Sequence, residues 1–541
     1  MSAGITMSGS VMPGSERETD LLYSPYGEVS YELFKKLRRA FADKSGVIAV
    51  LEDNGMSRYP VLLRPRRFGK STFVRMLKCF YDVSFQDCYD ELFAGTQIYT
   101  RNLASHNTYH VLNFDFSGVS GVKEDSLTRS FVIAVKSGIR DFQARYPDFA
   151  FSTEGAEQET PSGLIRSFTD AYKNYPAKKA LYLMIDEYDN CASSMLSRDL
   201  ELFNAITRAG GFLKDFYVAI KAAAADAGCV GKTFITGVSA VSLDSLTSGL
   251  NIARNVTFWD CFNAYAGFTE EELRKLIGEL LDLKQIGVTA NELSAIMKTQ
   301  FGGYCFSLQA QSTLYNSSMC LYYLDEMRLA GEYLAPEKYP DPASDHDGSK
   351  LQQLFDLAEK ELPETIIDTY LSGEPFYLPA LAQNINLNKL NRYSRDQLLS
   401  MLYYLGYLTI DPVLSGSDGL MLKIPNLFMS RLFAQSILDM KLKPSEIFRE
   451  QEIDVSALLA SSEDLSSFAR SCTGFVSSIV TNQVLSPMSE RALDLVLHAK
   501  LDTTRGLVTE CQKSLRVPGK GEQYADLALT VNKGRKMNAS T

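Results

Sequence analysis

The sequence predicts an α/β fold, in which helices cover both faces of a parallel β-sheet. Short apolar segments, of the kind that form buried parallel strands, alternate with helical segments through the N-terminal half of the chain. One of these strands runs into a glycine-containing loop that is followed directly by a helix, and another ends in two acidic residues. At 541 residues the chain is too long for one compact core, so we expect several domains.

The expected strands and helices alternate over residues 26–268. A helix is expected over residues 31–40 because the segment is amphipathic, and a short apolar run at residues 59–63 is the first strand. A helix over residues 71–81 follows the glycine-containing loop. Strand, loop and helix in this order is the arrangement that a phosphate-binding P-loop requires. Further strands are expected over residues 109–116, 181–185 and 232–238, with a fifth near residues 256–259.

The glycine-containing loop has the composition of a phosphate-binding site. In a P-loop, backbone N–H groups at the start of a helix surround the phosphates while a lysine ammonium reaches the β and γ oxygens. Gly69 and Lys70 fit these roles, and Ser71 is expected to supply a hydroxyl ligand to Mg²⁺. Arg64 replaces the first glycine of the usual GxxxxGK[ST] pattern, so the pattern alone leaves a purely structural loop as an alternative.

The nucleotide is expected to contact a continuous run of residues in this loop and at the start of the helix. Arg66 and Arg67 carry guanidinium groups, which suit either bidentate binding of phosphates or contact with a neighbouring segment. The sequence does not decide between these two possibilities. The expected nucleotide-binding residues are Arg66, Arg67, Phe68, Gly69, Lys70, Ser71 and Thr72.

Two acidic residues at the end of the strand over residues 181–185 support the prediction of nucleotide hydrolysis. In P-loop ATPases the first acid orients Mg²⁺ and the second polarises the attacking water. Asp186 and Glu187 are therefore expected to be catalytic together with Lys70, although acids also cap ordinary strand ends. Thr236 ends a further strand and is placed where a polar side chain contacts the γ-phosphate or the attacking water. The alternative for Thr236 is a hydroxyl that only has a backbone partner.

The pattern changes to helices after residue 268, and we expect a helical lid over residues 269–345. Thr269 is followed three residues later by Glu272, which is the pattern of a capping box at a helix start. Prolines and Asp-Gly turns make residues 333–350 a loop or linker in this prediction.

A helical, winged-helix-like domain is expected over residues 346–440. Helices around residues 395–404 lead into two alternating segments, at residues 407–410 and 420–424, which read as a hairpin joined by residues 415–419. Helices followed by a hairpin are typical of a winged helix-turn-helix, which could contact nucleic acid or serve only as a packing domain.

Composition bounds the class of protein. Hydrophobic residues make up 45% of the chain and charged residues 22%, which is ordinary for a soluble globular protein. No apolar run is long enough to cross a membrane, and residues 1–25 read as a flexible tail without a secretory signal. Nine dispersed cysteines without a CxxC pair favour a reducing, intracellular location, either cytoplasmic or nuclear. The net charge of -10 repels nucleic acid globally but does not exclude local contact.

Together, these motifs resemble the AAA-ATPase-like family that is found fused to a PD-(D/E)XK nuclease-like domain. The resemblance covers about residues 25–435 and implies ATP and Mg²⁺ as ligands, and an arginine at position 64 as a family feature. The motifs that carry it are Arg64-Pro65-Arg66-Arg67-Phe68-Gly69-Lys70-Ser71, Ile185-Asp186-Glu187-Tyr188-Asp189, Ile235-Thr236-Gly237-Val238-Ser239, Gly302-Gly303-Tyr304, Tyr404-Leu405-Gly406-Tyr407-Leu408-Thr409 and Ile424-Pro425-Asn426.

The resemblance is weaker over residues 441–541, where a small α+β nuclease-like domain is expected. Such nucleases hold a divalent metal with two carboxylates, and Asp494 and Glu510 align with them. Gln512 stands where the family has a catalytic lysine, so an inactive or remodelled domain is favoured over an active one. Two ordinary strand carboxylates are the competing interpretation. Strands are expected over residues 492–498 and 506–509, with a helix around residues 523–524.

Three functions are consistent with the sequence. The leading hypothesis is Mg²⁺-dependent ATP hydrolysis coupled to a domain movement. The second is a nucleotide-gated, metal-dependent nuclease acting on DNA or RNA through Asp494 and Glu510. The third is a non-hydrolysing nucleotide switch or scaffold, whose output is assembly with another protein or a second copy of the chain.

Overall fold

A five-stranded parallel sheet forms the centre of the N-terminal half in the computed structural model. Its strands lie in the order β2-β3-β4-β1-β5, and each neighbouring pair is parallel. Every residue of β1 and β3 is buried, as expected for strands that are covered on both faces. The parallel sheet predicted from the sequence is therefore confirmed. The strands are β1 (Pro60–Leu63), β2 (His110–Asp115), β3 (Leu181–Asp186), β4 (Val230–Gly237) and β5 (Arg254–Asn255).

The structure describes most of the chain, with gaps that are most frequent near its C-terminus. The described residues are 21–155, 159–196, 199–225, 229–241, 243–336, 345–383, 385, 392–442, 453, 466–481, 497, 500–501, 507–517 and 521–531.

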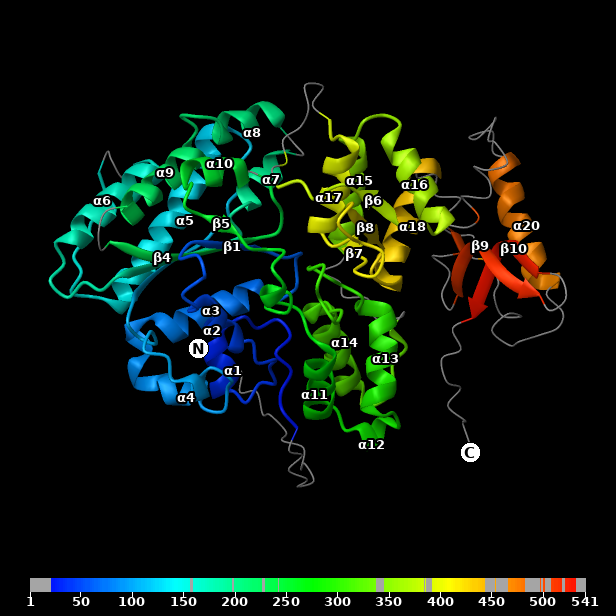
Figure 1. Ribbon diagram of the computed structural model, residues 1–541, viewed down its shortest axis with the longest axis horizontal. Helices are drawn as coiled ribbons and strands as arrows, with labels where there is room; N and C mark the ends of the chain where they lie inside the picture. The colour runs from blue at the N-terminus through cyan, green and yellow to red at the C-terminus, as the bar shows by residue number, and fades with distance from the viewer. Residues whose placement is uncertain are drawn as a thin grey trace, which may run out of the picture.

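Helices cover both faces of the sheet (Figure 1). α3 packs on one face against β2, β3 and β4, whereas α5 packs on β2 and α9 on β4 from the other side, with α6 against both helices. These helices are α3 (Lys70–Tyr81), α5 (Glu124–Arg145), α6 (Pro161–Lys173) and α9 (Phe212–Ala225). Shorter helices complete this part of the chain: α1 (Tyr31–Lys36), α2 (Gly46–Leu51), α4 (Tyr89–Phe93), α7 (Asn190–Leu196), α8 (Leu200–Thr207), α10 (Leu243–Gly249) and the 3-10 turns η1 (Val83–Cys88), η2 (Tyr99–Arg101) and η4 (Asp260–Phe262).

A helical unit follows the sheet, as the change of pattern after residue 268 predicts. The side chain of Thr269 accepts from the Glu272 N–H at 3.2 Å, and the Glu272 carboxylate accepts from the Thr269 N–H at 2.8 Å, so the predicted capping box starts this unit. The helices of the unit are α11 (Glu270–Leu280), α12 (Leu283–Ile286), α13 (Ala290–Phe301) and α14 (Ser317–Ala330).

A second unit combines helices with a three-stranded antiparallel sheet of order β6-β8-β7. The predicted hairpin is present as β7 (Thr409–Ile410) and β8 (Leu420–Lys423). The third strand, β6 (Phe376–Leu378), escaped prediction because it is three residues long and is followed by Pro379. The helices are α15 (Asp345–Asp356), α16 (Leu362–Ser372), α17 (Arg395–Tyr404) and α18 (Leu427–Leu442).

Three boundaries differ from the prediction, each for a local physical reason. The first helix ends at Lys36 rather than residue 40, because Arg38 turns the chain with a φ of +50°. The fifth strand covers Arg254–Asn255 rather than residues 256–259, because the Thr257 hydroxyl accepts from the Leu63 N–H at 3.1 Å in place of a backbone carbonyl. The loop predicted up to residue 350 is helical from residue 345, where α15 begins.

Near the C-terminus the described residues form a helix and a hairpin. The antiparallel strands β9 (Leu507–Val517) and β10 (Gly521–Val531) pair along their length, and α20 (Ser466–Thr481) precedes them. The strand predicted at residues 506–509 is present but much longer. The helix predicted around residues 523–524 is wrong, since both residues lie in β10. Most of the strand predicted over residues 492–498 lies outside the described residues, and residue 497 is helical.

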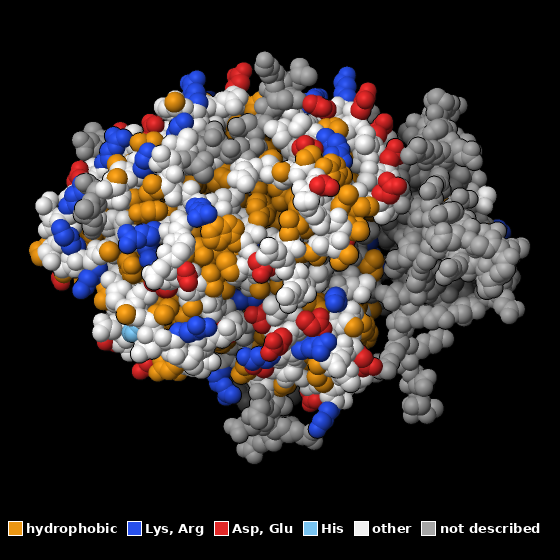
Figure 2. All heavy atoms as spheres, viewed as in Figure 1, with side chains coloured by type: hydrophobic (Ala, Val, Ile, Leu, Met, Phe, Trp, Pro, Cys, Tyr) orange, Lys and Arg blue, Asp and Glu red, His pale blue; other side chains and the backbone are white. Residues whose placement is uncertain are grey.

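The surface and the helices give two further observations. Figure 2 shows basic and acidic side chains interspersed over the described part of this face, rather than gathered into one basic patch. Within the described residues, none of the helices combines the length and apolarity that a membrane crossing needs.

Candidate functional site

The loop between β1 and α3 turns sharply and begins a helix at Lys70. Arg67 and Gly69 both have positive φ angles, +68° and +86°. A side chain at position 69 would meet only the Ser317 hydroxyl at 3.7 Å, so the left-handed backbone rather than lack of space makes glycine suitable there. The first N–H groups of α3 have no intrahelical acceptor, and the helix dipole adds partial positive charge at the same end. This end of α3 is therefore suited to bind an anion.

The Lys70 ammonium joins this loop to the acidic end of β3. Its Nζ lies 3.3 Å from the Pro65 carbonyl oxygen and 3.3 Å from Oε1 of Glu187. The Lys70 side chain is only 3% exposed, whereas that of Glu187 is 18% exposed. The structure thus brings together Lys70 and Glu187, which the sequence separates by more than a hundred residues.

Asp186 lies at the end of β3 next to the start of α3. Burial raises the pKa of its carboxyl to about 6, against the opposing effect of a hydrogen bond from the Ser71 hydroxyl. The nearby Glu187 carboxylate raises this pKa further, and Lys70 lowers it. A hydroxyl and a buried carboxylate in contact are hard oxygen donors, the type that Mg²⁺ prefers in nucleotide sites. Ser71 and Asp186 therefore fit the metal-binding role predicted for them.

Glu187 has a strained backbone. Its φ of +54° is uncommon for a residue other than glycine, and such strain concentrates at functional sites. Hydrogen bonds on both sides hold this conformation: the Glu187 N–H donates to Oδ1 of Asp186 at 3.0 Å, and the Tyr188 N–H donates to the Thr236 carbonyl at 3.1 Å. The turn at Glu187 is thereby fixed between β3 and β4.

The Thr236 hydroxyl has the backbone partner that the alternative interpretation of this residue expects. It is fully buried, and its hydroxyl donates to the Leu62 carbonyl at 2.7 Å, with the Tyr265 hydroxyl 3.4 Å away. Its side chain therefore ties β4 to β1 and is not among the residues that line the cavity described below. A strand-end threonine satisfies its hydroxyl in this way when the neighbouring strand offers a carbonyl, which the sequence cannot reveal.

Asp189 is a site residue to which the sequence prediction gave no role. Its buried carboxylate accepts hydrogen bonds from the N–H groups of Val238 and Ser239, at 2.9 and 2.8 Å, and from the Ser239 hydroxyl at 2.7 Å. The Ser193 hydroxyl donates to the same carboxylate at 3.3 Å. Asp189 thus clamps the segment after β3 onto the segment after β4, two residues from the strained Glu187. Its place in the motif Ile185-Asp186-Glu187-Tyr188-Asp189 is the only signal in the sequence.

For the ATPase activity that we propose below, we expect Asp189→Asn to lower the rate of nucleotide turnover by up to about 100-fold while leaving the KM for the nucleotide nearly unchanged, because a small displacement of Glu187 affects the reaction more than binding. An amide places an N–H donor opposite the donors at residues 238 and 239. The measurement is steady-state kinetics of phosphate release. Ser193→Ala, which removes only the longest of these hydrogen bonds, should stay close to wild type. Equal losses of kcat and affinity would instead indicate a general collapse of the site.

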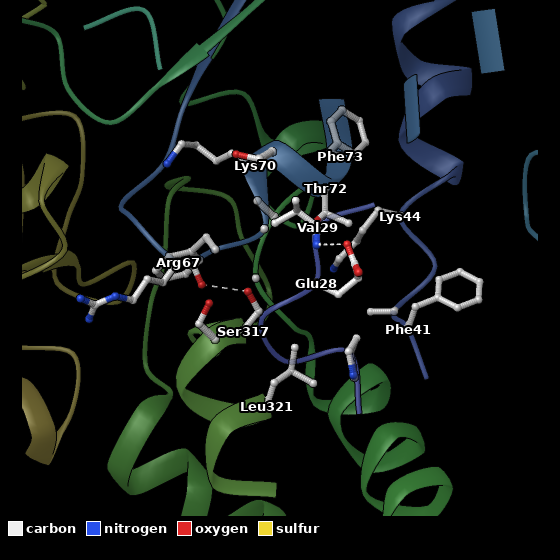
Figure 3. A pocket seen from close by; sticks show the side chains of 18 of the residues that line it. Glu28, Val29, Phe41, Lys44, Arg67, Lys70, Thr72, Phe73, Ser317 and Leu321 are labelled. Atoms are coloured by element: carbon white, nitrogen blue, oxygen red, sulfur yellow. Dashed lines mark hydrogen bonds between the residues drawn. The ribbon is translucent and has the colours of Figure 1, made fainter. Parts of the chain in front are cut away.

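A cavity of about 530 Å³ opens beside these residues (Figure 3). This volume is in the range of pockets that hold small ligands and cofactors. Residues 66–72 and Glu187 are among the residues that line it. Of the residues predicted to bind nucleotide, all of Arg66, Arg67, Phe68, Gly69, Lys70, Ser71 and Thr72 therefore border one cavity.

Part of the cavity lining is apolar. Val29, Phe41 and Leu321 contribute to it, and Figure 3 shows Phe41 on the side away from Lys70 and Arg67. Lys44 also lines the cavity, and its ammonium forms an ion pair with Glu272 at 2.6 Å. Burial lowers the pKa of Lys44, and the charge of Glu272 opposes that effect. The ion pair joins the segment before β1 to helix α11. These lining residues could not be predicted from the sequence, because they are scattered over three segments.

The helical unit after the sheet contacts the phosphate-binding loop directly. The Ser317 hydroxyl and the Ser318 N–H, at the start of α14, both donate to the Arg67 carbonyl, at 2.9 and 3.1 Å. The Gly267 N–H donates to the Phe68 carbonyl at 2.7 Å. Figure 3 shows the Arg67 side chain extending away from the cavity, so its backbone rather than its guanidinium lies nearest to the helical unit.

Arg64 occupies the position of the missing glycine and is almost completely buried, with 1% of its surface exposed. Its guanidinium donates to the carbonyls of Leu63, Thr257, Phe262 and Asn263 at 2.7 to 3.3 Å. The rings of Tyr265 and Phe306 lie 5.0 and 4.3 Å from its central carbon. Burial lowers the pKa of Arg64 from its ordinary value. Arg64 is thus a structural anchor for the start of the loop, and the substitution of glycine follows from this role.

The second unit contacts the same region through the remaining motifs. The Cys305 N–H donates to the Thr409 hydroxyl at 2.7 Å, and that hydroxyl donates back to the Cys305 carbonyl at 3.0 Å. The Asn426 amide donates to the Gly302 carbonyl at 2.7 Å. Gly303 has a φ of +87° and lies so close to the Pro425 carbonyl that no side chain fits. These motifs therefore form a joint between the two units that follow the sheet.

The predicted metal ligands near the C-terminus have no described geometry. Asp494 lies outside the described residues, and Glu510 lies in β9, whose backbone alone is described. The structure therefore does not place these two carboxylates together.

Comparisons with known proteins concern mainly the N-terminal half. Residues 25–247 match the model of a family described as "Predicted AAA-ATPase". A protein of Azotobacter chroococcum mcd 1, described as an uncharacterized protein in the vnfD 5' region, is 29% identical over 256 residues, which are 45% of this chain and 43% of that protein. This chain thus matches less than half of that relative's length.

A solved structure gives a further comparison. The Walker-type ATPase of Pyrococcus abyssi aligns with 72% of this chain and 94% of its own, at 13% identity and a TM-score of 0.36. The family match ends at residue 247, before the segment in which nuclease-like motifs were expected. Over residues 25–247, which contain the phosphate-binding loop and both acids of β3, this chain is therefore similar to the predicted AAA-ATPase family.

Proposed function

We propose that this chain is an ATPase, which binds ATP with Mg²⁺ and hydrolyses it. The observation that carries the proposal is that Lys70, Ser71 and Glu187 line one nucleotide-sized cavity, with Asp186 hydrogen-bonded to Ser71 directly behind it. The match of residues 25–247 to the predicted AAA-ATPase family supports it.

The phosphates are held by the loop and the start of α3. Their oxygens accept from the N–H groups of residues 69–72 and from the Lys70 ammonium, while Ser71 and Asp186 hold Mg²⁺. Mg²⁺ supplies positive charge that neutralises the phosphate oxygens. Phosphate oxygens also compete with Glu187 for Lys70, so binding frees the Glu187 carboxylate from its 3.3 Å ion pair.

Glu187 is the base of the reaction. Its carboxylate orients a water molecule and takes its proton as the water oxygen bonds to the γ-phosphorus. The bond between that phosphorus and the bridging oxygen breaks, and ADP and inorganic phosphate are the products. The strained backbone at Glu187 and the clamp formed by Asp189 fix the direction from which this carboxylate acts.

The apolar part of the cavity lining accommodates the base of the nucleotide. Val29, Phe41 and Leu321 offer flat or aliphatic surface, and Figure 3 shows Phe41 on the side away from Lys70 and Arg67. A purine has a large apolar face and polar edges, which suits this division of the cavity.

Hydrolysis is coupled to movement of the two units that follow the sheet. The helical unit donates two hydrogen bonds to Arg67 in the phosphate-binding loop, and the joint at Thr409 and Asn426 extends this contact to the second unit. The conformation of the phosphate-binding loop is expected to differ between the ATP-bound and ADP-bound states. Such a difference would change the contacts that the loop makes with the helical unit and, through it, with the second unit.

The test is a turnover assay on the full chain with ATP and with GTP. We expect steady release of phosphate from ATP when Mg²⁺ is present and its loss when EDTA removes the metal, because Ser71 and Asp186 then have no cation to place on the phosphates. Excess Mg²⁺ should restore turnover, which controls for damage by the chelator. Single- and double-stranded DNA are added in parallel reactions and analysed for cleavage.

Two results would contradict the proposal. Tight binding of ATP without any turnover would indicate a nucleotide switch. Cleavage of the added DNA that depends on ATP and is lost in Asp494→Ala would favour a nuclease, in which hydrolysis serves another reaction.

A further inference from the structure

A second cavity lies on the other side of Glu187. It has a volume of about 340 Å³ and separates the sheet from the second unit, with lining residues from α7, α15 and α17. Among the described residues, only Arg66 and Glu187 line both this cavity and the nucleotide cavity. The two spaces therefore meet at the residues that border the reacting end of the nucleotide.

The side of the second cavity near this meeting point carries positive charge. Arg66 is exposed, and the described residues provide no hydrogen bond or ion pair for its guanidinium. Lys350 of α15 lines the cavity as well, and it shares with Arg66 a smaller cavity of about 20 Å³ beside the phosphate-binding loop. Two cations from different units thus border the same space, and two positive charges that face one space favour an anion in it.

The remaining lining is mixed. Asn190, Ser193 and Ser194 come from α7, whereas Leu354 and Met401 come from the second unit. The carboxylates of Glu187 and Asp189 also line the cavity, and that of Asp189 already accepts hydrogen bonds from the N–H groups of residues 238 and 239. A volume of about 340 Å³ admits a phosphate ion with several water molecules, each of which occupies roughly 30 Å³. The space is thus larger than a channel for the attacking water requires.

We propose that the second cavity receives the inorganic phosphate produced by hydrolysis and holds it between Arg66 and Lys350 before it leaves. This inference rests on the proposed ATPase function. The attacking water and the departing phosphate lie on the Glu187 side of the nucleotide, and ADP blocks the nucleotide cavity until it dissociates. The second cavity is therefore the open route for phosphate. Because Lys350 belongs to the second unit, phosphate in this cavity contacts both sides of the boundary between units.

The first experiment measures binding of inorganic phosphate to the full chain loaded with Mg²⁺ and ADP, by phosphorus NMR titration. Lys350→Gln keeps a polar side chain and removes its charge, and we expect about tenfold weaker binding of phosphate with unchanged binding of ATP. Lys360→Gln is the matched control, because Lys360 is exposed shortly after the same helix and lines neither cavity.

The second experiment follows a single turnover, with ATP cleavage measured after acid quench and phosphate release measured with a fluorescent phosphate sensor. Gln353→Trp adds bulk to the second cavity from an exposed position, so the fold should be retained. We expect cleavage at the wild-type rate and release that lags several-fold behind it.

The inference is overturned if Lys350→Gln binds phosphate as tightly as wild type, or if release keeps pace with cleavage in Gln353→Trp. Both results leave the ATPase proposal intact, provided that wild type hydrolyses ATP. If wild type hydrolyses no ATP, the proposed function fails, yet binding of phosphate that depends on Lys350 would still establish the anion site.

Discussion

Glu187→Gln is expected to lower the turnover of ATP by about 10²- to 10⁴-fold while ATP still binds. The amide has nearly the same shape as the carboxylate, so the strained turn at residue 187 and its backbone hydrogen bonds should persist. It cannot take a proton from water near neutral pH, and it no longer competes with phosphate for Lys70, which lies 3.3 Å away. Binding of ATP should therefore be equal or tighter. Calorimetry or a fluorescent nucleotide measures binding, and phosphate release measures turnover.

Lys70→Ala is expected to affect binding as well as chemistry, in contrast to Glu187→Gln. It removes the cation at the phosphates, so both affinity for ATP and turnover should fall. The control for Glu187→Gln is Glu201→Gln, which also removes an acidic charge. Glu201 is exposed on α8 and does not line the cavity. Unchanged turnover in both Glu187→Gln and Lys70→Ala would show that the reaction occurs elsewhere in the chain.

Arg64→Gly, which restores the usual glycine of the P-loop pattern, is expected to destabilise the protein by about 3–5 kcal/mol. The substitution leaves carbonyls at four positions without their donor and empties the space between the rings of Tyr265 and Phe306. The backbone gains nothing in return, since Arg64 is not among the residues with positive φ. Urea denaturation followed by circular dichroism measures the loss in free energy of unfolding.

Arg38→Gly is the matched control for this experiment. Arg38 is exposed and has a φ of +50°, so glycine there relieves strain at no cost in contacts and should leave stability equal or slightly higher. If Arg64→Gly were as stable as wild type, the buried guanidinium would have no structural role, and the resemblance to a family with arginine at this position would need another explanation.

Much of the sheet could be predicted because the cues for its elements are local. The residues of β1 and β3 form short apolar runs, and full burial of both strands follows from that composition. Thr269 and Glu272 define the start of α11 within three residues of each other. The cues fail where a strand is very short, as β6 is. They also fail where a side chain replaces a backbone hydrogen-bond partner, as the Thr257 hydroxyl does beside β1.

The sequence by itself determined the α/β sheet, the loop that holds Lys70 and Ser71, and the acids that end β3. The tertiary structure alone decided the role of Arg64, whose carbonyl partners lie up to 199 residues away in sequence, and that of Asp189, whose partners at residues 238 and 239 lie about 50 residues away. It also placed Lys350 beside Arg66 at a second cavity. Local patterns record how a residue interacts with its neighbours in the chain, whereas buried hydrogen bonds and cavities depend on segments that only folding brings together.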